Sequence, residues 1–179
     1  MVSITEIKQL SVDTAKGGML PSVFAAQAIL ESGVFKGGST LARNYNNYFG
    51  IKKGSSWTGK TVTLPTKENY NGIDVYIKDE FRVYDTPRQS FEDRVNLFLN
   101  SSRYKDVYTY DTPEEQAKAL QRAGYATDPN YASKLIQIID THNLRELDKK
   151  KKNMKTIQII VLVLALSIVV ATTYSLVTG

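Results

Sequence analysis

Apolar residues recur at helical spacing through the first third of the chain. A capping box from Ser3 to Glu6 precedes apolar positions three residues apart, which predicts a short amphipathic helix that ends near a Gly-Gly pair. A second apolar run starts at Pro21, a residue suited to the first position of a helix, and stops at Gly33, which can close a helix in the left-handed conformation. Ser39 is placed to cap a third, brief helix.

The middle of the chain changes from helical spacing to alternation. Apolar residues alternate with polar ones over 62–64 and again over 73–77. The Asn71-Gly72 pair between these segments is a strong signal for a hairpin turn. A further short strand is predicted at 81–84. These features predict a small β-hairpin lobe.

Helical spacing returns after the lobe. Thr86 and Thr112 each precede a proline at the first helical position, and a capping box from Thr112 to Glu115 strengthens the second of these starts. Another helix is predicted to start at Asp128-Pro129. The fold class predicted from this part of the chain is α+β and mainly α, with the β-hairpin lobe inserted among helices.

The end of the chain is uncharged and apolar. At about 1.5 Å per residue, a helix over 157–177 covers the roughly 30 Å of a bilayer's hydrocarbon core. We therefore predict a domain at 1–147, a basic juxtamembrane linker at 148–156 and a single transmembrane helix at 157–177. The start of the chain lacks a long apolar run behind a basic residue, so no Sec-type signal peptide is expected there.

Composition narrows the chemistry. The chain has no cysteine, which excludes disulfides, thiolate metal sites and cysteine nucleophiles, and its single histidine, His142, lacks the partners for a histidine-based metal site or a catalytic triad. No metal or other cofactor is expected. Of the 23 basic residues, five are the lysines at 149–152 and 155, and the other 18 balance the 18 acidic residues. The net charge of +5 therefore belongs to the membrane junction, and no nucleic-acid partner is expected.

Glu31 is the first candidate for a catalytic residue. In the last turn of its predicted helix, a carboxylate faces the negative end of the helix dipole. The apolar residues at 28–30 would also desolvate it. Both effects favour the protonated form, which a general acid needs near neutral pH. The alternative interpretation is a surface glutamate at a helix end.

The segment after this helix, 44–52, is rich in amides and aromatic rings. Aromatic faces stack on sugar rings, and amides bind hydroxyl and acetamido groups, so this composition suits a carbohydrate groove. We assign Asn47, Tyr48, Phe49 and the distant Tyr131 to the walls of such a groove. The alternative is an ordinary polar turn followed by a core phenylalanine.

Four segments carry the most distinctive sequences: QAILESG at 27–33, NNYFGIK at 46–52, FRVY at 81–84 with SF at 90–91, and AGYATDPNY at 123–131. In this order they resemble the motifs of bacterial glucosaminidases of glycoside hydrolase family 73. The resemblance extends over residues 5–145 and leaves the C-terminal segment outside. It implies a lysozyme-like domain with endo-β-N-acetylglucosaminidase activity, which cuts peptidoglycan glycan strands after N-acetylglucosamine.

The resemblance also implies roles for three residues. Glu31 falls at the family's catalytic acid, Glu68 at a second acidic residue on the β lobe, and Tyr125 at a tyrosine near the reacting sugar. Glu68 would stabilise the oxocarbenium charge or activate water, or the substrate's own acetamido oxygen would attack while Tyr125 positions it. The sequence leaves these alternatives open. The other acids of the lobe, Asp74, Asp79 and Glu80, are interpreted as solvated charges at strand edges.

The predicted function is a membrane-tethered peptidoglycan hydrolase, for which a phage or prophage lysin is one origin that fits. The alternative is a non-catalytic wall-binding protein or a holin-like protein that makes membrane lesions. The expected partners are peptidoglycan strands and the lipid bilayer. The lysines favour a cytoplasmic domain, whereas the substrate lies on the cell-wall side. Release through a breached membrane or translocation of the domain would resolve this conflict.

Overall fold

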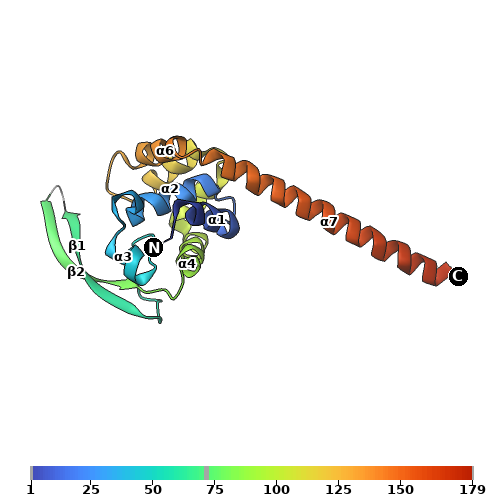
Figure 1. Cartoon of the computed structure of the whole chain (residues 1–179), viewed down its shortest axis with the longest axis horizontal. Helices are drawn as coiled ribbons and strands as arrows, with labels where there is room; N and C mark the ends of the chain where they lie inside the picture. Colours follow the sequence, from blue (N-terminus) through green and yellow to red (C-terminus); the bar gives the residue numbers. More distant parts are fainter. Residues whose placement is uncertain (1, 71–72, 179) are drawn as a thin grey trace.

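The computed structural model of this chain describes residues 2–70 and 73–178, except for the side chains of 67–70, 73–74 and 169–178. The predicted turn at Asn71-Gly72 lies outside the described residues. The elements in chain order are α1 (Ile4–Thr14), α2 (Pro21–Ser32), η1 (Val34–Lys36), α3 (Thr40–Tyr45), β1 (Thr61–Tyr70), β2 (Ile73–Arg82), α4 (Pro87–Leu99), η2 (Ser102–Thr109), α5 (Pro113–Arg122), α6 (Tyr131–Thr141) and α7 (Arg145–Thr178). The mainly helical α+β class predicted from the sequence is confirmed (Figure 1).

The predicted helix starts agree closely with the structure. Ser3 and Glu6 form the full capping box of α1, which ends at Thr14, before the predicted glycine pair. Gly33 closes α2 with φ of 62°, and Ser39 caps α3. Thr86 caps α4 and forms a capping box with Gln89.

Two predicted starts need correction. Thr112 caps α5 by accepting from the Glu115 amide, but the Glu115 side chain bonds the Thr112 hydroxyl instead of the Thr112 amide, so the capping box is incomplete. The last helix of the domain starts at Tyr131 and not at Asp128, because the Asp128 side chain accepts from the Asn130 amide and holds a turn there.

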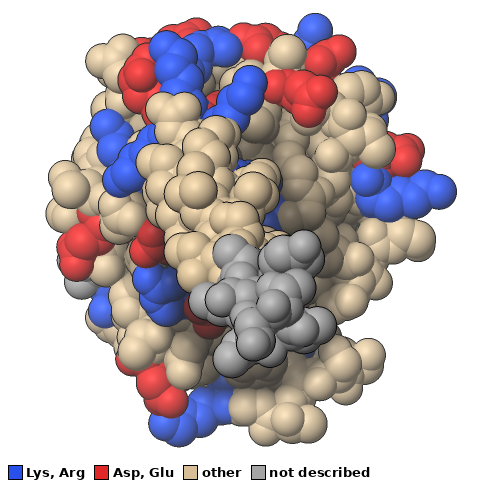
Figure 2. All heavy atoms as spheres, turned by 90° about the vertical axis from the view of Figure 1, so that its right-hand side faces the viewer, with Lys and Arg blue, Asp and Glu red and all other residues tan. Residues whose placement is uncertain are grey.

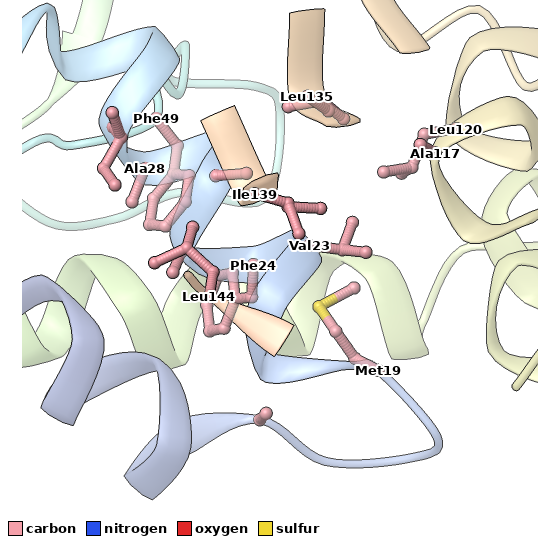
Figure 3. Packing of buried hydrophobic residues seen from close by; sticks show 14 of the residues in the cluster. Met19, Val23, Phe24, Ala28, Phe49, Ala117, Leu120, Leu135, Ile139 and Leu144 are labelled. Atoms are coloured by element: carbon pink, nitrogen blue, oxygen red, sulfur yellow. The ribbon is translucent and has the colours of Figure 1, made fainter. Parts of the chain in front are cut away.

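Helix α2 is the centre of the core. Ten of its twelve residues are buried, and it packs against α1, α5, α6 and α7. Figure 3 shows Val23 and Phe24 of α2 among side chains from α5 and α6. Leu144, from the short segment between α6 and α7, belongs to the same cluster. A helix that is closely packed on nearly all sides cannot shift without disrupting the core. The end of α2, where Glu31 lies, is therefore a fixed point of the fold.

The β lobe is a two-stranded antiparallel sheet. Its register pairs Thr61 with Arg82 at the base and continues without a break to Tyr70 and Ile73. The separate strand predicted at 81–84 is wrong, because 81–82 continue β2 and only Val83 and Tyr84 lie beyond it. In Figure 1 the two strands extend away from the helices.

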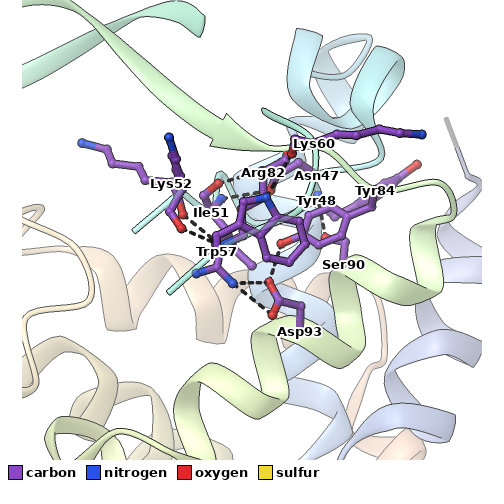
Figure 4. A network of polar contacts seen from close by, with 11 residues as sticks. Asn47, Tyr48, Ile51, Lys52, Trp57, Lys60, Arg82, Tyr84, Ser90 and Asp93 are labelled. Atoms are coloured by element: carbon purple, nitrogen blue, oxygen red, sulfur yellow. Dashed lines mark hydrogen bonds and ion pairs between the residues drawn. The ribbon is translucent and has the colours of Figure 1, made fainter. Parts of the chain in front are cut away.

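A polar network at the base of the lobe joins it to α4 (Figure 4). Arg82 forms an ion pair with Asp93 at 2.8 Å, and the Tyr84 hydroxyl donates to the same carboxylate at 2.6 Å. The Arg82 guanidinium lies 4.7 Å from the centre of the Trp57 ring, while its Nε donates to the Lys52 carbonyl. Because Arg82 is buried, these contacts replace its lost hydration.

Helix α7 begins in the domain and then leaves it. Its first turns contact α1 and α2: Asp148 accepts from the Ser22 amide, and Lys151 donates to the Val12 carbonyl. Beyond them the helix projects away from the domain (Figure 1). Apolar side chains from Ile157 to Ile168 are exposed. Figure 2, seen from this end, shows lysine, arginine, aspartate and glutamate side chains mostly towards the edge of this face.

Within the described residues, no helix is both long and apolar enough to cross a membrane. The transmembrane helix predicted at 157–177 is therefore not supported. The apolar stretch with described side chains, 157–168, covers only about 18 Å of helix axis. The remainder of the predicted span lies beyond the side chains described.

Candidate active site

A cleft of about 830 Å³ lies between the helical body and the β lobe. Glu31 stands at the end of α2 in one wall, and the segment from Leu64 to Thr66 of β1 contributes to the lining from the lobe. The lining is mixed, with apolar and aromatic groups beside a few polar ones. It further includes Ser39, Lys52, Phe81, Leu97, Phe98, Ser101, Tyr104, Tyr125 and Ala126.

Glu31 is the carboxylic acid among the described residues that line the cleft. Burial raises the pKa of the Glu31 carboxyl, and a hydrogen bond from Tyr131 and the positive charge of Arg94 oppose this rise in part. The direction agrees with the expectation from the sequence. The net effect extends the protonated form to higher pH, as a general acid requires.

The two predicted tyrosines lie next to Glu31 in different ways. The Tyr131 hydroxyl donates to Glu31 Oε1 at 3.0 Å, and its ring is buried at the start of α6. Tyr125 lines the cleft, with its ring centre 5.4 Å from that of Tyr131. Burial and the Glu31 charge both raise the pKa of Tyr125, so its hydroxyl stays protonated. Tyr131 thus contacts the carboxylate from behind, while Tyr125 faces the cleft.

Two of the other predicted groove residues, Asn47 and Tyr48, lie below the cleft surface. Asn47 is buried and uses its side chain to bind the backbone of Ile51 and Arg82. Tyr48 is also buried, and its hydroxyl accepts from the Val2 amide. The structure therefore does not bring Asn47 and Tyr48 into the cleft, because their polar groups are engaged in holding the loop. Phe49 contributes to both core and cleft, since it stacks on Phe24 and also lines the cleft.

The β lobe carries the remaining acids. Glu68 lies in β1 opposite Val75, and its side chain is outside the described residues. Asp79 pairs with Lys52 at 2.9 Å and Glu80 with Lys53 at 3.0 Å. These partners lower the pKa of both carboxyls, so neither acts as an acid near neutral pH. The side chain of Asp74 also lies outside the described residues.

Two polar residues beneath Glu31 were not predicted as site residues from the sequence. Gln27 and Arg94 are both buried, and Arg94 Nη2 donates to Gln27 Oε1. A signal was available, because Arg94 lies three residues after Phe91 and four before Phe98, on the buried face of α4. Among the described residues, no group of three acidic or histidine side chains is arranged to hold a metal ion.

A family model described as mannosyl-glycoprotein endo-beta-N-acetylglucosaminidase matches residues 9–144 of this chain. The match extends from α1 to Leu144 and includes the whole cleft. The chain belongs to this glucosaminidase family. The lysozyme-like arrangement of helices and a small β lobe that the sequence predicted is supported by solved structures of a peptidoglycan hydrolase and of an autolysin, at 37% and 34% sequence identity.

Relatives of this glucosaminidase family agree with the assignment. The exo-glucosaminidase LytG of Bacillus subtilis is 39% identical over 146 residues, which are 79% of this chain and 50% of that protein. The peptidoglycan hydrolase FlgJ of Salmonella typhimurium is 41% identical over 69% of this chain and 40% of its own length. The chain therefore spans about half the length, or less, of these two relatives.

A solved structure extends the comparison to the fold. The catalytic domain of the autolysin Auto from Listeria monocytogenes superposes with a TM-score of 0.68 at 34% sequence identity. The match covers 81% of this chain and 85% of that domain. The likeness thus includes most of the Auto catalytic domain.

Proposed function

We propose that this glucosaminidase-family chain is a peptidoglycan hydrolase in which Glu31 is the general acid. The observation that carries the proposal is a largely buried carboxyl with a raised pKa in the wall of a cleft about 830 Å³ in volume. FlgJ is named a peptidoglycan hydrolase, which supports peptidoglycan as the substrate class, and LytG is named an exo-glucosaminidase, which supports cleavage at a glucosamine residue. We further propose that the bond cut is the one between N-acetylglucosamine and N-acetylmuramic acid.

In the proposed reaction, Glu31 donates its proton to the glycosidic oxygen as the bond to the anomeric carbon breaks. The sugar then carries oxocarbenium character, which a nearby negative group stabilises. We propose Glu68 for this second role, because it lies in β1 two residues beyond Thr66, and the strand segment from Leu64 to Thr66 lines the cleft. Tyr125 is proposed to position the substrate's acetamido group. The cleft-facing place of Tyr125 supports this role.

Substitution of Glu31 by glutamine tests the proposal, since it removes the transferable proton and keeps the shape. Purified cell walls are incubated with each protein, and new reducing ends are counted and identified after borohydride reduction. We expect the Glu31→Gln rate to fall by at least about 100-fold. The matched control is Glu146→Gln, whose side chain is 67% exposed on α7 and which should keep the wild-type rate.

Two results would overturn the proposal. One is a Glu31→Gln protein that still cleaves walls at the wild-type rate. The other is a wild-type protein that binds walls without new reducing ends, as the non-catalytic alternative requires. The anomer released in the first turnover further distinguishes the roles of the second group. Inversion indicates a water activated by a base, whereas retention indicates attack by a carboxylate or by the acetamido oxygen.

We also propose that the apolar part of α7 attaches the enzyme to a lipid bilayer. The support is the uncharged sequence after Lys155 together with the exposed apolar side chains from Ile157 to Ile168. Flotation with liposomes tests this attachment, and a Leu162→Lys/Leu166→Lys double variant should lose it. Protease digestion of intact protoplasts would then show on which side of the membrane the domain lies.

A further inference from the structure

A continuous line of hydrogen bonds runs from the core to Glu31. Arg94 of α4 donates through Nη2 to Gln27 Oε1 on α2. The Gln27 Nε2 group donates to the Tyr131 hydroxyl of α6 at 3.0 Å, and that hydroxyl donates to Glu31 Oε1 at 3.0 Å. Three helices thus contribute one polar group each behind the carboxyl, and α2 also carries the carboxyl itself.

The chemistry of Arg94 sets the direction of every bond in this line. A guanidinium has donors and no acceptor, so the Gln27 atom facing it must be the amide oxygen. The amide nitrogen then faces Tyr131 and donates to it. The Tyr131 hydroxyl has a single proton, which is left for Glu31 Oε1. Reversal at either of the first two links would leave two donors or two acceptors in contact, and at the third link the Tyr131 proton has no other acceptor among the described residues.

The line is buried along its whole length, which fixes it in place. Arg94, Gln27 and Tyr131 are each no more than 2% exposed. Arg94 has no ion pair with an acid among the described residues, and its guanidinium lies 3.4 Å from the centre of the Phe98 ring. Breaking any of these bonds would strand a polar group away from water. Such a network holds one arrangement.

We propose that Arg94, Gln27 and Tyr131 are positioning residues that keep Glu31 Oε1 as an acceptor, so that the proton to be transferred is carried by Oε2. Among the described residues, Oε2 makes no hydrogen bond, and Glu31 lines the cleft. This inference rests on the proposed role of Glu31 as the general acid. It assigns to Arg94, a buried residue that also borders the cleft, a function that acts through Gln27 and Tyr131.

Other charged or titratable groups near Glu31 define what a pH experiment would detect. Arg94 approaches from α4 and Tyr131 from α6, while Tyr125 comes from the segment between α5 and α6. Lys52 and Tyr104 line the same cleft. Among the described groups, Tyr131 and Arg94 are the two that lower the pKa of Glu31 against the effect of burial. Their removal should therefore raise it.

Two nearly isosteric variants test the positioning role. Tyr131→Phe removes only the hydroxyl that donates to Oε1. Gln27→Glu keeps the contact with Arg94 but has no proton to donate, so the Tyr131 proton is shared between two carboxylates. Both changes stabilise the Glu31 carboxylate less, so both should move the alkaline limb of the kcat/KM profile to higher pH. We expect kcat to fall by up to about 100-fold through misplacement of the proton, with little change in KM.

Tyr110→Phe is the matched control, because its hydroxyl accepts from Arg122 at 3.3 Å and Tyr110 is not among the residues that line the cleft. It should leave the profile unchanged. Melting temperatures are measured for all variants. If Tyr131→Phe does not fold, Gln27→Glu decides. A wild-type alkaline limb in both folded variants, with kcat reduced or not, would overturn the positioning role.

A carboxyl-¹³C NMR titration of Glu31 separates this inference from the proposed function. If wild-type protein releases no new reducing ends, the proposed function fails, and the positioning role of the line as stated fails with it. If the wild type is active and the Glu31 titration is the same with and without the Tyr131 hydroxyl, only the positioning role fails. A higher pKa for Glu31 in Tyr131→Phe supports it.

Discussion

The two walls of the cleft are built in opposite ways. The wall that carries Glu31 is the end of α2, a helix with ten of twelve residues buried and other helices on several sides. The wall formed by the β lobe consists of two strands that pair mainly with each other. Towards the end of the lobe, Tyr76 is 76% exposed. One wall is part of the core, whereas the other is joined to it at its base.

The two walls differ because the proton donor and the opposite wall have different structural requirements. A proton donor needs a fixed position and a dry environment, and both come from burial in the helical body. A lobe with few buried apolar contacts draws its stability from the contacts at its base, and local opening there costs less than opening of the core. Packing of the helical body therefore fixes the position of Glu31, whereas the Arg82–Asp93 network fixes the position of the β lobe at its base.

The largest expected effect on stability comes from breaking that network. Asp93→Ala leaves the buried Arg82 without its counter-charge and the Tyr84 hydroxyl without its acceptor. We expect a loss of about 3–5 kcal/mol in the free energy of unfolding. Urea denaturation followed by circular dichroism measures it.

An exposed ion pair on the same side provides the control. Lys60 and Asp85 lie 3.0 Å apart, with side chains 73% and 69% exposed. Asp85→Ala should cost less than about 1 kcal/mol, because water screens this pair. Equal losses for Asp93→Ala and Asp85→Ala would contradict the comparison, since they would show that the buried Arg82–Asp93 pair stabilises the fold no more than an exposed ion pair does.

The smallest effect is expected at the exposed part of the lobe. Tyr76→Ser changes a side chain that is 76% exposed in β2. The free energy of unfolding should change by no more than about 0.5 kcal/mol. A thermal melt of the variant beside the wild type checks this value. A loss of several kcal/mol would mean that the lobe is part of the main core.

Sequence patterns predicted what is decided locally. The caps of α1, α2, α3 and α4 follow from one or two residues each, and so does the place of Glu31 at a helix end. The predicted lobe follows from alternation. The 3₁₀ helix η2, at Ser102–Thr109, was missed because it has neither alternation nor the 3.6-residue period.

The parts of the site that depend on tertiary contacts were not predictable in the same way. The composition around Asn47 and Tyr48 suited a sugar groove. An asparagine whose amide binds the backbone, however, cannot be distinguished in the sequence from one whose amide binds a ligand. The line from Arg94 to Glu31 joins three helices, so no single segment contains it. Only the polar residues at apolar positions of their helices, at 27 and 94, indicated that a polar group was buried there.

The central claim is that the helical wall holds Glu31 as a protonated acid. The most direct measurement is a carboxyl-¹³C NMR titration of the wild-type protein, with the Glu31 signal assigned by its absence in Glu31→Gln. We predict that Glu31 titrates above the ordinary glutamate value of 4.5, so that it keeps its proton at a pH where exposed glutamates have lost theirs. A Glu31 carboxyl that titrates at or below that value would contradict the account.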